Sequence, residues 1–111
     1  NYAGDFPLWL APIQVRLLPV SDEQQHYALE VAMQLKQAGY RVEIDKSGER
    51  LGKQIRTGEL EKIPVLAVIG KREVSSKTLS VRTRQGGDLG SMTLADLLEK
   101  MQTAILSKTN L

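Results

Sequence analysis

The feature that most constrains the fold is PVLAVIG, residues 64–70, a nearly continuous apolar run that follows Ile63. Such a run is typical of a strand that is covered on both faces, because a half-exposed strand alternates apolar and polar residues instead. A sheet that contains such a strand is sandwiched between two layers of helices. We therefore predict an α/β fold and expect Val65, Ala67 and Ile69 to be buried.

Upstream of this run, two strand patterns flank one helix pattern. Residues 13–20, IQVRLLPV, and residues 40–44, YRVEI, have the β-branched or alternating character of strands. The helix between them is predicted to begin at a capping box formed by Ser21 and Gln24 and to end at Gly39, which can adopt a positive φ. Its inward-facing stripe consists of Ala28, Val31, Ala32 and Leu35.

The remaining elements complete a mixed sheet. A shorter helix is expected after the loop 45–49, the segment EVSSKTLSVRTR (residues 73–84) is expected to form a hairpin, and a last helix begins at Thr93 or Ser91. The order strand, helix, strand, helix, strand, hairpin, helix predicts a three-layer α/β domain with three parallel strands and one antiparallel strand. The inward-facing residues of the last two helices are Leu51, Ile55 and Leu60, and Leu94, Leu97, Leu98, Met101 and Ile105.

Charge is unevenly distributed along the 111 residues, although the net charge is only +2. Residues 46–84 contain ten Lys and Arg and four Glu, a local balance of +6, so the remainder carries −4. A basic segment of this kind indicates a polyanionic partner. The absence of cysteine excludes disulfides and thiolate metal sites and is compatible with a reducing cytoplasm. No apolar run reaches the length that spans a bilayer.

The sequence contains no recognisable set of catalytic residues. His26 is its only histidine and falls in the first turns of the first helix, where a solvated surface residue is by far the more frequent case. Neither paired acids nor an HExxH motif is present, and Asp22 and Glu23 suit a helix N-terminus. We predict neither a catalytic site nor a metal site in this chain.

Residues 81–92, VRTRQGGDLGSM, place two arginines ahead of a glycine-rich turn. The glycines form the pattern G-G-x-x-G, which matches neither the dinucleotide-binding motif nor a Walker loop. We interpret them as a tight reversal between an edge strand and the last helix. The three glycines are Gly86, Gly87 and Gly90.

Arg82 and Arg84 lie two residues apart in an expected strand, so both would project from one face of the sheet. Glu73, on the other arm of the expected hairpin, would approach the same face. An arginine can read guanine through two hydrogen bonds, and a carboxylate can accept from a base N–H in unpaired RNA. The alternative is a surface ion pair between Glu73 and an arginine, worth about 0–1 kcal/mol. Residue chemistry alone supports both interpretations about equally.

Three stretches carry a resemblance to a known family: FPLWLAPIQVRLLPVSD, RLGKQIRTGELEKIPVLAVIGKREV and SVRTRQGGDLGSM. Together they resemble the C-terminal anticodon-binding domain of bacterial-type threonyl-tRNA synthetases, which are class II synthetases, over essentially the whole chain. The resemblance implies a five-stranded mixed sheet of order 2-1-3-4-5 with one antiparallel strand and three helices. Residues 1–12 would be a linker from the end of the catalytic domain and residues 13–111 the anticodon-binding domain, so we expect a fragment of a longer chain.

The resemblance also implies roles for residues that match the motifs of the family. Arg82 would read the middle guanine of the anticodon, and Glu73 would contact its last base. Gly48 occupies the place of a loop asparagine that touches the anticodon, and Gln54 stands where the family usually has lysine. The remaining expected tRNA contacts are Arg84 at the anticodon and, at the RNA backbone, Arg50, Lys53 and Arg56.

The implied function is recognition of the anticodon stem-loop of threonine tRNA, in support of threonylation during translation. All threonine codons imply anticodons that end in guanine and uracil, which suit an arginine fork and a carboxylate. No cofactor is expected in this chain, whereas ATP and zinc would act in the catalytic domain of the parent enzyme, a cytoplasmic homodimer without a membrane segment. The alternative is a stand-alone RNA-binding or protein-interaction module derived from such a domain.

Overall fold

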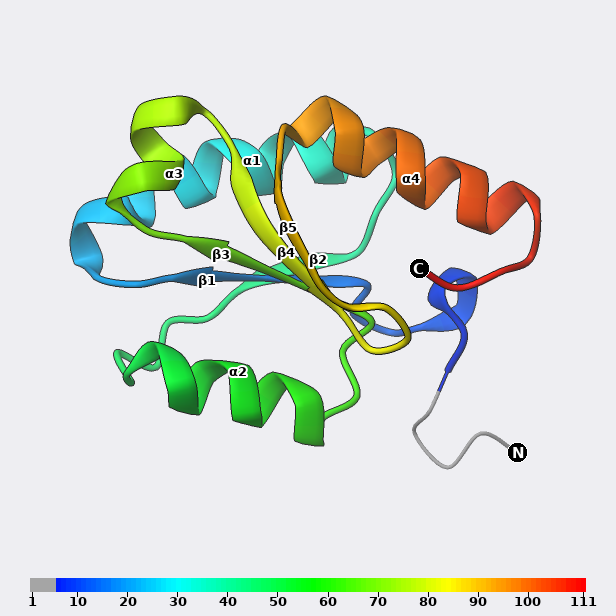
Figure 1. Ribbon diagram of the computed structural model, residues 1–111, viewed down its shortest axis with the longest axis horizontal. Coiled ribbons are helices and arrows are strands. Elements are labelled where there is room, and N and C mark those ends of the chain that lie inside the picture. The colour runs from blue at the N-terminus through cyan, green and yellow to red at the C-terminus, as the bar shows by residue number, and fades with distance from the viewer. Residues whose placement is uncertain (1–5) are drawn as a thin grey trace.

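Residues 6–111 form one five-stranded sheet with helices on both faces, as the computed structural model shows (Figure 1). The structure describes these residues and no others. The strands are β1 (Val15–Pro19), β2 (Val42–Ile44), β3 (Val65–Ile69), β4 (Leu79–Thr83) and β5 (Gly87–Met92). Their order is β2-β1-β3-β4-β5, with β1 parallel to β2 and β3, and β4 antiparallel to both of its neighbours. The predicted mixed sheet, its strand order and its single antiparallel strand are confirmed.

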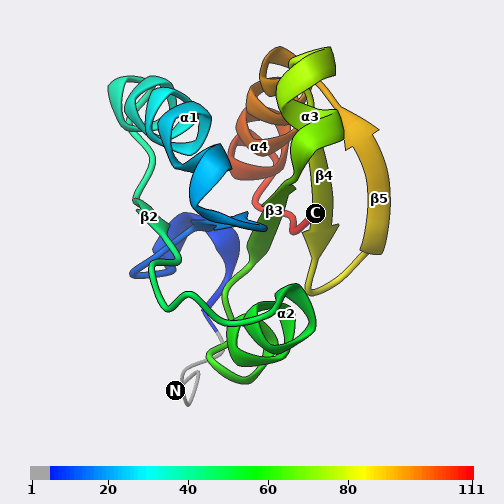
Figure 2. The ribbon, with the colours of Figure 1, turned by 90° about the vertical axis from the view of Figure 1, so that its left-hand side faces the viewer.

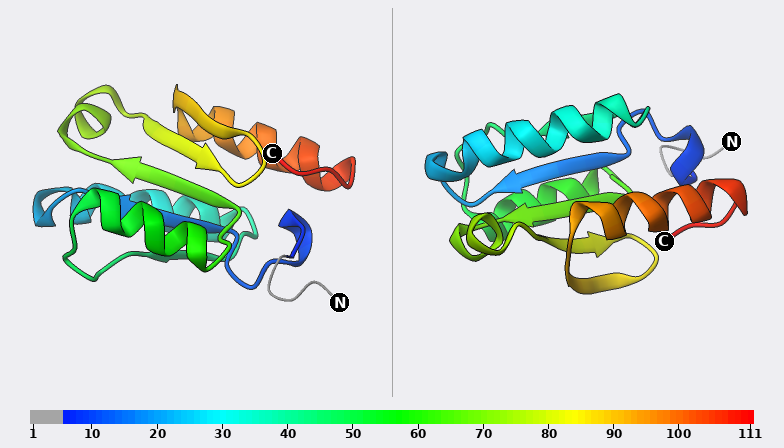
Figure 3. Two further views of the ribbon diagram at one scale, coloured as in Figure 1. Left: turned by 60° about the horizontal axis from the view of Figure 1, so that its bottom comes forward. Right: turned by 90° about the horizontal axis from the view of Figure 1, so that it is seen from above.

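The described part of the chain contains four α-helices, one more than expected. They are α1 (Gln25–Gln37), α2 (Leu51–Leu60), α3 (Lys71–Ser76) and α4 (Leu94–Leu106). Two views of the ribbon place α1 and α4 on one face of the sheet and α2 on the opposite face (Figure 3). The expected three layers are therefore present, and the additional helix is the short α3.

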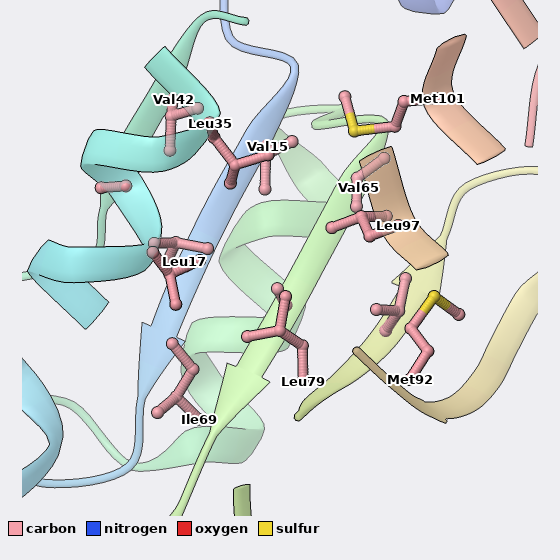
Figure 4. Close-up of a cluster of buried hydrophobic side chains, with 14 of the residues drawn as sticks. Val15, Leu17, Leu35, Val42, Val65, Ile69, Leu79, Met92, Leu97 and Met101 are labelled. Carbon is pink, nitrogen blue, oxygen red and sulfur yellow. The ribbon is translucent and has the colours of Figure 1, made fainter. Parts of the chain in front are cut away.

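Alternate strand residues enter two separate hydrophobic cores. Val65, Ala67 and Ile69 of β3 are each 0% exposed and belong to the core beneath α1 and α4 (Figure 4), which confirms their predicted burial. Leu66 and Val68 point the other way and pack beneath α2. This division explains the unbroken apolar run in the sequence, because both faces of β3 are covered.

The first helix forms as the sequence predicts. The backbone N–H of Ser21 donates to Oε1 of Gln24 at 2.8 Å, and this capping box opens a single 3₁₀ turn that leads into α1. Gly39 follows the helix with φ of +96°, a conformation that a residue without Cβ adopts at little cost. The buried residues of α1 are the expected Ala28, Val31, Ala32 and Leu35.

Helix α2 approaches the sheet closely at a glycine. A Cβ atom on Gly58 would lie 2.6 Å from Cδ2 of Leu66, so this position has no room for a side chain unless Leu66 moves. The expectation that Leu60 faces inward is wrong: it is 74% exposed, because it lies outside the helical stripe that contacts the sheet. That stripe consists of Leu51, Gln54, Ile55 and Gly58.

A buried arginine fixes the C-terminal end of α2 to the sheet. Arg16 of β1 is 8% exposed; its Nε donates to Glu43 of β2 at 2.6 Å and its guanidinium donates to Glu61, just after α2, at 2.6 Å. Burial lowers the pKa of Arg16, but the hydrogen bonds with Glu61 and Glu43 outweigh it, so the pKa lies above its usual value. The end of α2 therefore has a defined position relative to the strands.

The expected hairpin over residues 73–84 is wrong in its first half, which forms α3. The carboxylate of Glu73 accepts a hydrogen bond from the backbone N–H of Gly70 at 2.7 Å, and this bond caps the first turn of the helix. Val74 packs against the core, and Lys77 closes the helix with φ of +58°. Six residues are too few for a helical period to be recognised in the sequence.

The hairpin is instead formed by β4 and β5, so the glycine-rich stretch is a strand as well as a turn. The N–H of Gly86 donates to Oγ1 of Thr83 at 2.8 Å and closes the reversal. Gly87 and Gly90 have φ of +70° and +82°, which accounts for glycine at both positions. The last helix begins after β5, where Oγ1 of Thr93 accepts from the N–H of Asp96 at 3.1 Å. Of the two predicted caps, Thr93 is correct.

The expected linker, residues 1–12, lies partly outside the described residues, which begin at Phe6. Leu8 is 1% exposed and joins the core beneath α4. The backbone N–H of Leu8 donates to Oδ1 of Asn110 at 3.0 Å, and Nζ of Lys108 lies 5.3 Å from the centre of the Trp9 ring. This segment therefore contacts the C-terminal end of the described chain.

Candidate RNA-binding surface

The part of the sheet that α2 leaves uncovered is formed by β4 and β5. In β4 the residues Leu79, Val81 and Thr83 are buried toward α4, so Ser80 and Arg82 project from the opposite face. Among the described residues, the core beneath α2 includes none from β4 or β5. Figure 2 shows α2 below the sheet, with β5 at its outer edge. This face is therefore open to a large partner.

A groove of about 250 Å³ lies where this open face meets the C-terminal end of α2. Its apolar lining comes from Ile63 and Leu66, and Leu66 is the residue that pairs with Arg82 across β3 and β4. We call this site the arginine groove. Its lining residues are Glu59, Ile63, Leu66, Arg82, Thr83, Arg84 and Gly87. Four elements (α2, β3, β4 and β5), the loop after α2 and the turn after β4 thus contribute to a single concave site.

Arg82 lies between two carboxylates. One guanidinium nitrogen is 4.0 Å from Oε2 of Glu59 and the other is 3.9 Å from Oδ2 of Asp88. The Arg82 side chain is 35% exposed, so its head is accessible, although not fully. Glu73 was expected to be its partner, but the carboxylate of Glu73 instead lies 3.7 Å from Arg72. Sequence reasoning found Arg82 and missed both of its partners.

Arg84 lines the same groove as Arg82, but it lies in the turn after β4 and not in the strand itself. It follows the last residue of β4 and belongs to the turn, where its backbone N–H donates to the carbonyl of Pro64 at 3.1 Å. Its side chain is exposed and lines the arginine groove beside Arg82. The two arginines therefore line one groove, with Arg84 one residue beyond the end of β4.

Glu73 lies at the other end of β4 from Arg82. It belongs to α3, which follows β3, and β3 and β4 are antiparallel, so α3 is close to the start of β4. Its side chain is 7% exposed, and one carboxylate oxygen accepts the capping hydrogen bond from Gly70. The structure therefore gives Glu73 a clear structural role.

We expect Glu73→Ala to lower the free energy of unfolding by about 1–3 kcal/mol, because a buried, charge-assisted hydrogen bond is lost and the N–H of Gly70 loses its partner. Urea unfolding followed by circular dichroism measures this change. Glu99→Ala is the matched control, since Glu99 is exposed on α4. Equal stability of the two variants would show that the Glu73 carboxylate contributes little to the fold.

Gly48 lies at a second cavity of about 270 Å³, beside the C-terminal ends of β1 and β2. Its φ is +72°, in a loop where the N–H of Ser47 donates to Oδ1 of Asp45 at 2.8 Å. Gln54 is 3% exposed here; its Nε2 donates to the carbonyls of Pro19 and Glu49, while Oε1 has no partner among the described residues. The residues that line this cavity are Pro19, Val20, Ser21, Asp22, Gln25, Asp45, Gly48, Glu49 and Gln54.

The three basic residues expected at the RNA backbone are all exposed on or beside α2. Arg56 lies three residues before Glu59 and so shares the side of α2 that borders the arginine groove. Lys53 forms an ion pair with Glu49 at 3.5 Å, and Arg50 occupies the N-cap position of the helix. Of these residues, helical spacing places Arg56 on the groove side.

Other kinds of site receive no support in residues 6–111. The side chain of His26 is 87% exposed and lies 3.3 Å from Glu30, as expected of a solvated helix residue. No cluster of three His, Cys, Asp or Glu residues suitable for a metal ion occurs in the described part. None of the helices described is both long and apolar enough to cross a membrane.

Comparison with protein families matches residues 14–104 to the family described as "Anticodon binding domain". The chain is 58% identical over 105 residues to the threonine–tRNA ligase of Thermosynechococcus vestitus, which covers 95% of this chain and 17% of the ligase. It is 62% identical over 104 residues to the threonine–tRNA ligase of Synechococcus sp. strain WH7803, covering 94% of this chain and 17% of that ligase. The chain thus spans a small part of these relatives.

Two solved structures have the same fold. The RNA-binding domain of threonyl-tRNA synthetase from Cryptosporidium parvum superposes with a TM-score of 0.84 at 30% identity, over 92% of this chain and 26% of that one. Histidyl-tRNA synthetase from Nostoc sp. PCC 7120 superposes with a TM-score of 0.78 at 30% identity, over 86% of this chain and 23% of that one.

Proposed function

The chain belongs to the anticodon-binding domain family, and from that premise we propose that it recognises the anticodon of threonine tRNA. The arginine groove is the observation that carries the proposal, because it presents hydrogen-bond donors beside apolar surface on an open face. Arg82 is the residue that reads the middle guanine of the anticodon. High identity to two threonine–tRNA ligases supports threonine tRNA over other tRNAs.

The charges around the arginine groove favour a base over a phosphate. The positive charges of Arg82 and Arg84 are matched by the negative charges of Glu59 and Asp88. A phosphate site needs an excess of positive charge, whereas the edge of a base carries neutral donors and acceptors. Unpaired bases can also pack on apolar side chains such as Leu66. A splayed anticodon base therefore suits this groove.

The RNA backbone is bound outside the groove. We assign this role to Arg56 first, because it shares the groove side of α2, and then to Arg50 and Lys53, which are exposed at the start of the same helix. Gly48 leaves space in its loop for the RNA chain, since nothing lies within 4 Å of a Cβ built there. Glu73 remains assigned to the last anticodon base, through the carboxylate oxygen that faces Arg72.

The proposed biological role is to support threonylation within a longer threonine–tRNA ligase. ATP and zinc would act in the catalytic domain of that enzyme, in a cytoplasmic homodimer. The described residues of this chain supply recognition and no catalytic group. A stand-alone RNA-binding or protein-interaction role is less well supported, because the matched relatives are ligases.

Binding of the chain to a threonine anticodon stem-loop tests the proposal. We expect weak binding that falls roughly 10- to 20-fold between about 50 and 200 mM salt, as release of counterions from about three phosphate contacts to single-stranded RNA requires. Fluorescence anisotropy with a labelled stem-loop measures the affinity. A stem-loop of equal length with an unrelated anticodon is the control. Binding that does not depend on salt, or that is equal for the two RNAs, would contradict the proposal.

A further inference from the structure

We propose that Glu59 and Arg82 together read the Watson–Crick edge of a guanine, and that Asp88 holds the arginine in position. The proposal rests on the proposed function and names two further residues of the same site. Arg82 would donate to O6 of the guanine and, through the second arm of its fork, to the adjacent N7, and Glu59 would accept from N1–H and from the 2-amino group. Glu59 is then a base-contact residue, and Asp88 is a positioning residue that acts through Arg82.

Arg82 has hydrogen-bond donors available for a ligand. Its two carboxylate contacts, at 4.0 and 3.9 Å, are too long for hydrogen bonds, and the guanidinium donates none within residues 6–111. A guanidinium carries five N–H donors and is always charged. Its charge is thus balanced by Glu59 and Asp88 while its N–H groups stay available for a partner in the groove.

Glu59 presents the complementary acceptors. It lines the groove from the last turn of α2, its side chain is 59% exposed, and its carboxylate forms an ion pair with Arg82. An ionised carboxylate accepts through two oxygens. Guanine is the RNA base that offers two neighbouring donors beside an acceptor on this edge; adenine and cytosine offer one amino group, and uracil one imino group. The pair of side chains therefore matches guanine best.

Asp88 is itself held by the backbone. Its Oδ1 accepts from the N–H of Gly90 at 2.9 Å, which leaves Oδ2 to face Arg82 at 3.9 Å. A register shift in β4 and β5, between Val81 and Arg82, places Asp88 directly opposite Arg82. Bulges of this kind often re-aim a side chain at a binding site. Asp88 does not line the groove, so it acts on the base only through the arginine.

The first experiment compares two anticodon stem-loops that differ at the middle base, guanine in one and inosine in the other. Inosine lacks only the 2-amino group. We expect the unmodified chain to bind the inosine loop about tenfold more weakly than the guanine loop, which is the usual scale for a lost base contact. We expect Glu59→Gln to bind the two loops with affinities within about twofold of each other. Glu99→Gln, which removes a carboxylate on the opposite face, is expected to keep the tenfold preference.

The second experiment tests the positioning role of Asp88. Asp88→Asn keeps an oxygen that accepts from Gly90 but loses the charge that faces Arg82. We expect it to weaken binding of the guanine loop about fivefold in the unmodified background, at the low end of a base contact, and to have no effect once Arg82 is alanine. A purely structural role for Asp88 would give the same loss in both backgrounds and would overturn this part of the inference.

The outcomes separate this inference from the proposed function. If Arg82→Ala abolishes the preference for guanine but Glu59→Gln retains the guanine-to-inosine ratio, the proposed function stands and the role of Glu59 is overturned. If Arg82→Ala leaves binding of every loop unchanged, the proposed function fails, and the inference fails with it. Loss of the inosine discrimination in Glu59→Gln alone, with Glu99→Gln unchanged, supports the inference.

Discussion

Replacing Arg82 by alanine is expected to weaken binding of the threonine anticodon stem-loop by about 1–3 kcal/mol, or roughly 5- to 150-fold, the loss of one bidentate base contact. Arg82 projects from the uncovered face of β4, its head is accessible, and its N–H donors are not used within the described residues. Arg82→Lys is expected to restore little of the affinity, because a single ammonium lacks the planar fork.

Fluorescence anisotropy at one fixed salt concentration measures this change, since the nonspecific part of RNA binding depends on salt. Lys100→Ala is the matched control: Lys100 is exposed on α4, on the opposite face of the sheet, and its loss changes the net charge equally. Equal losses in Arg82→Ala and Lys100→Ala would show that only overall charge matters.

Replacing Leu17 by alanine is expected to lower the free energy of unfolding by about 2–5 kcal/mol. Leu17 is 0% exposed and lies in β1, where it pairs with Ile44 of β2 on one side and Ala67 of β3 on the other. Removal of its side chain leaves a cavity at the centre of the core beneath α1, and the strands on both sides limit relaxation.

Urea unfolding of the chain measures this loss, with Leu29→Ala as the control. Leu29 is 52% exposed on α1, so its truncation is expected to change stability by less than about 0.5 kcal/mol. Similar stability of the two variants would contradict the burial of Leu17 and, with it, the central position of β1 in the sheet.

The parts of the fold that could be predicted are those with a strong local signal. The apolar run of β3 shows that both faces of the sheet are covered, and the box of Ser21 and Gln24 marks the entry to α1. Helix α4 has a long apolar stripe and a threonine cap. In each case the residues that determine the element lie within or next to the element itself.

Two elements were missed because their signals are short or ambiguous. Helix α3 has only six residues, and its cap depends on a glycine that precedes it, so Glu73 was read as part of a strand. In β5, Gly87 and Gly90 have positive φ, and glycine in a strand reads as a loop. A bulge in the pairing of β4 with β5 accommodates these glycines, and no local sequence pattern predicts that bulge.

The candidate site could also be predicted only in part from the sequence. Arg82 was predicted from its strand pattern and from the resemblance to a family, but Glu59 was not, because Glu59 approaches it from α2 only after the sheet and the helix have packed together. Asp88 was not predicted either, because its contact with Arg82 depends on the register of β5. Contacts between distant segments are set by tertiary packing.

The most direct test of anticodon recognition by Arg82 is a double-mutant cycle. Four affinities are measured, for the unmodified chain and Arg82→Ala, each with a threonine anticodon stem-loop that carries guanine or adenine at the middle position. We predict that Arg82→Ala costs roughly 5- to 150-fold with guanine and less than about twofold with adenine, because the contact is then already lost. If Arg82→Ala costs the same factor with both loops, Arg82 binds the RNA backbone or supports the fold, and recognition of the guanine by this residue is refuted.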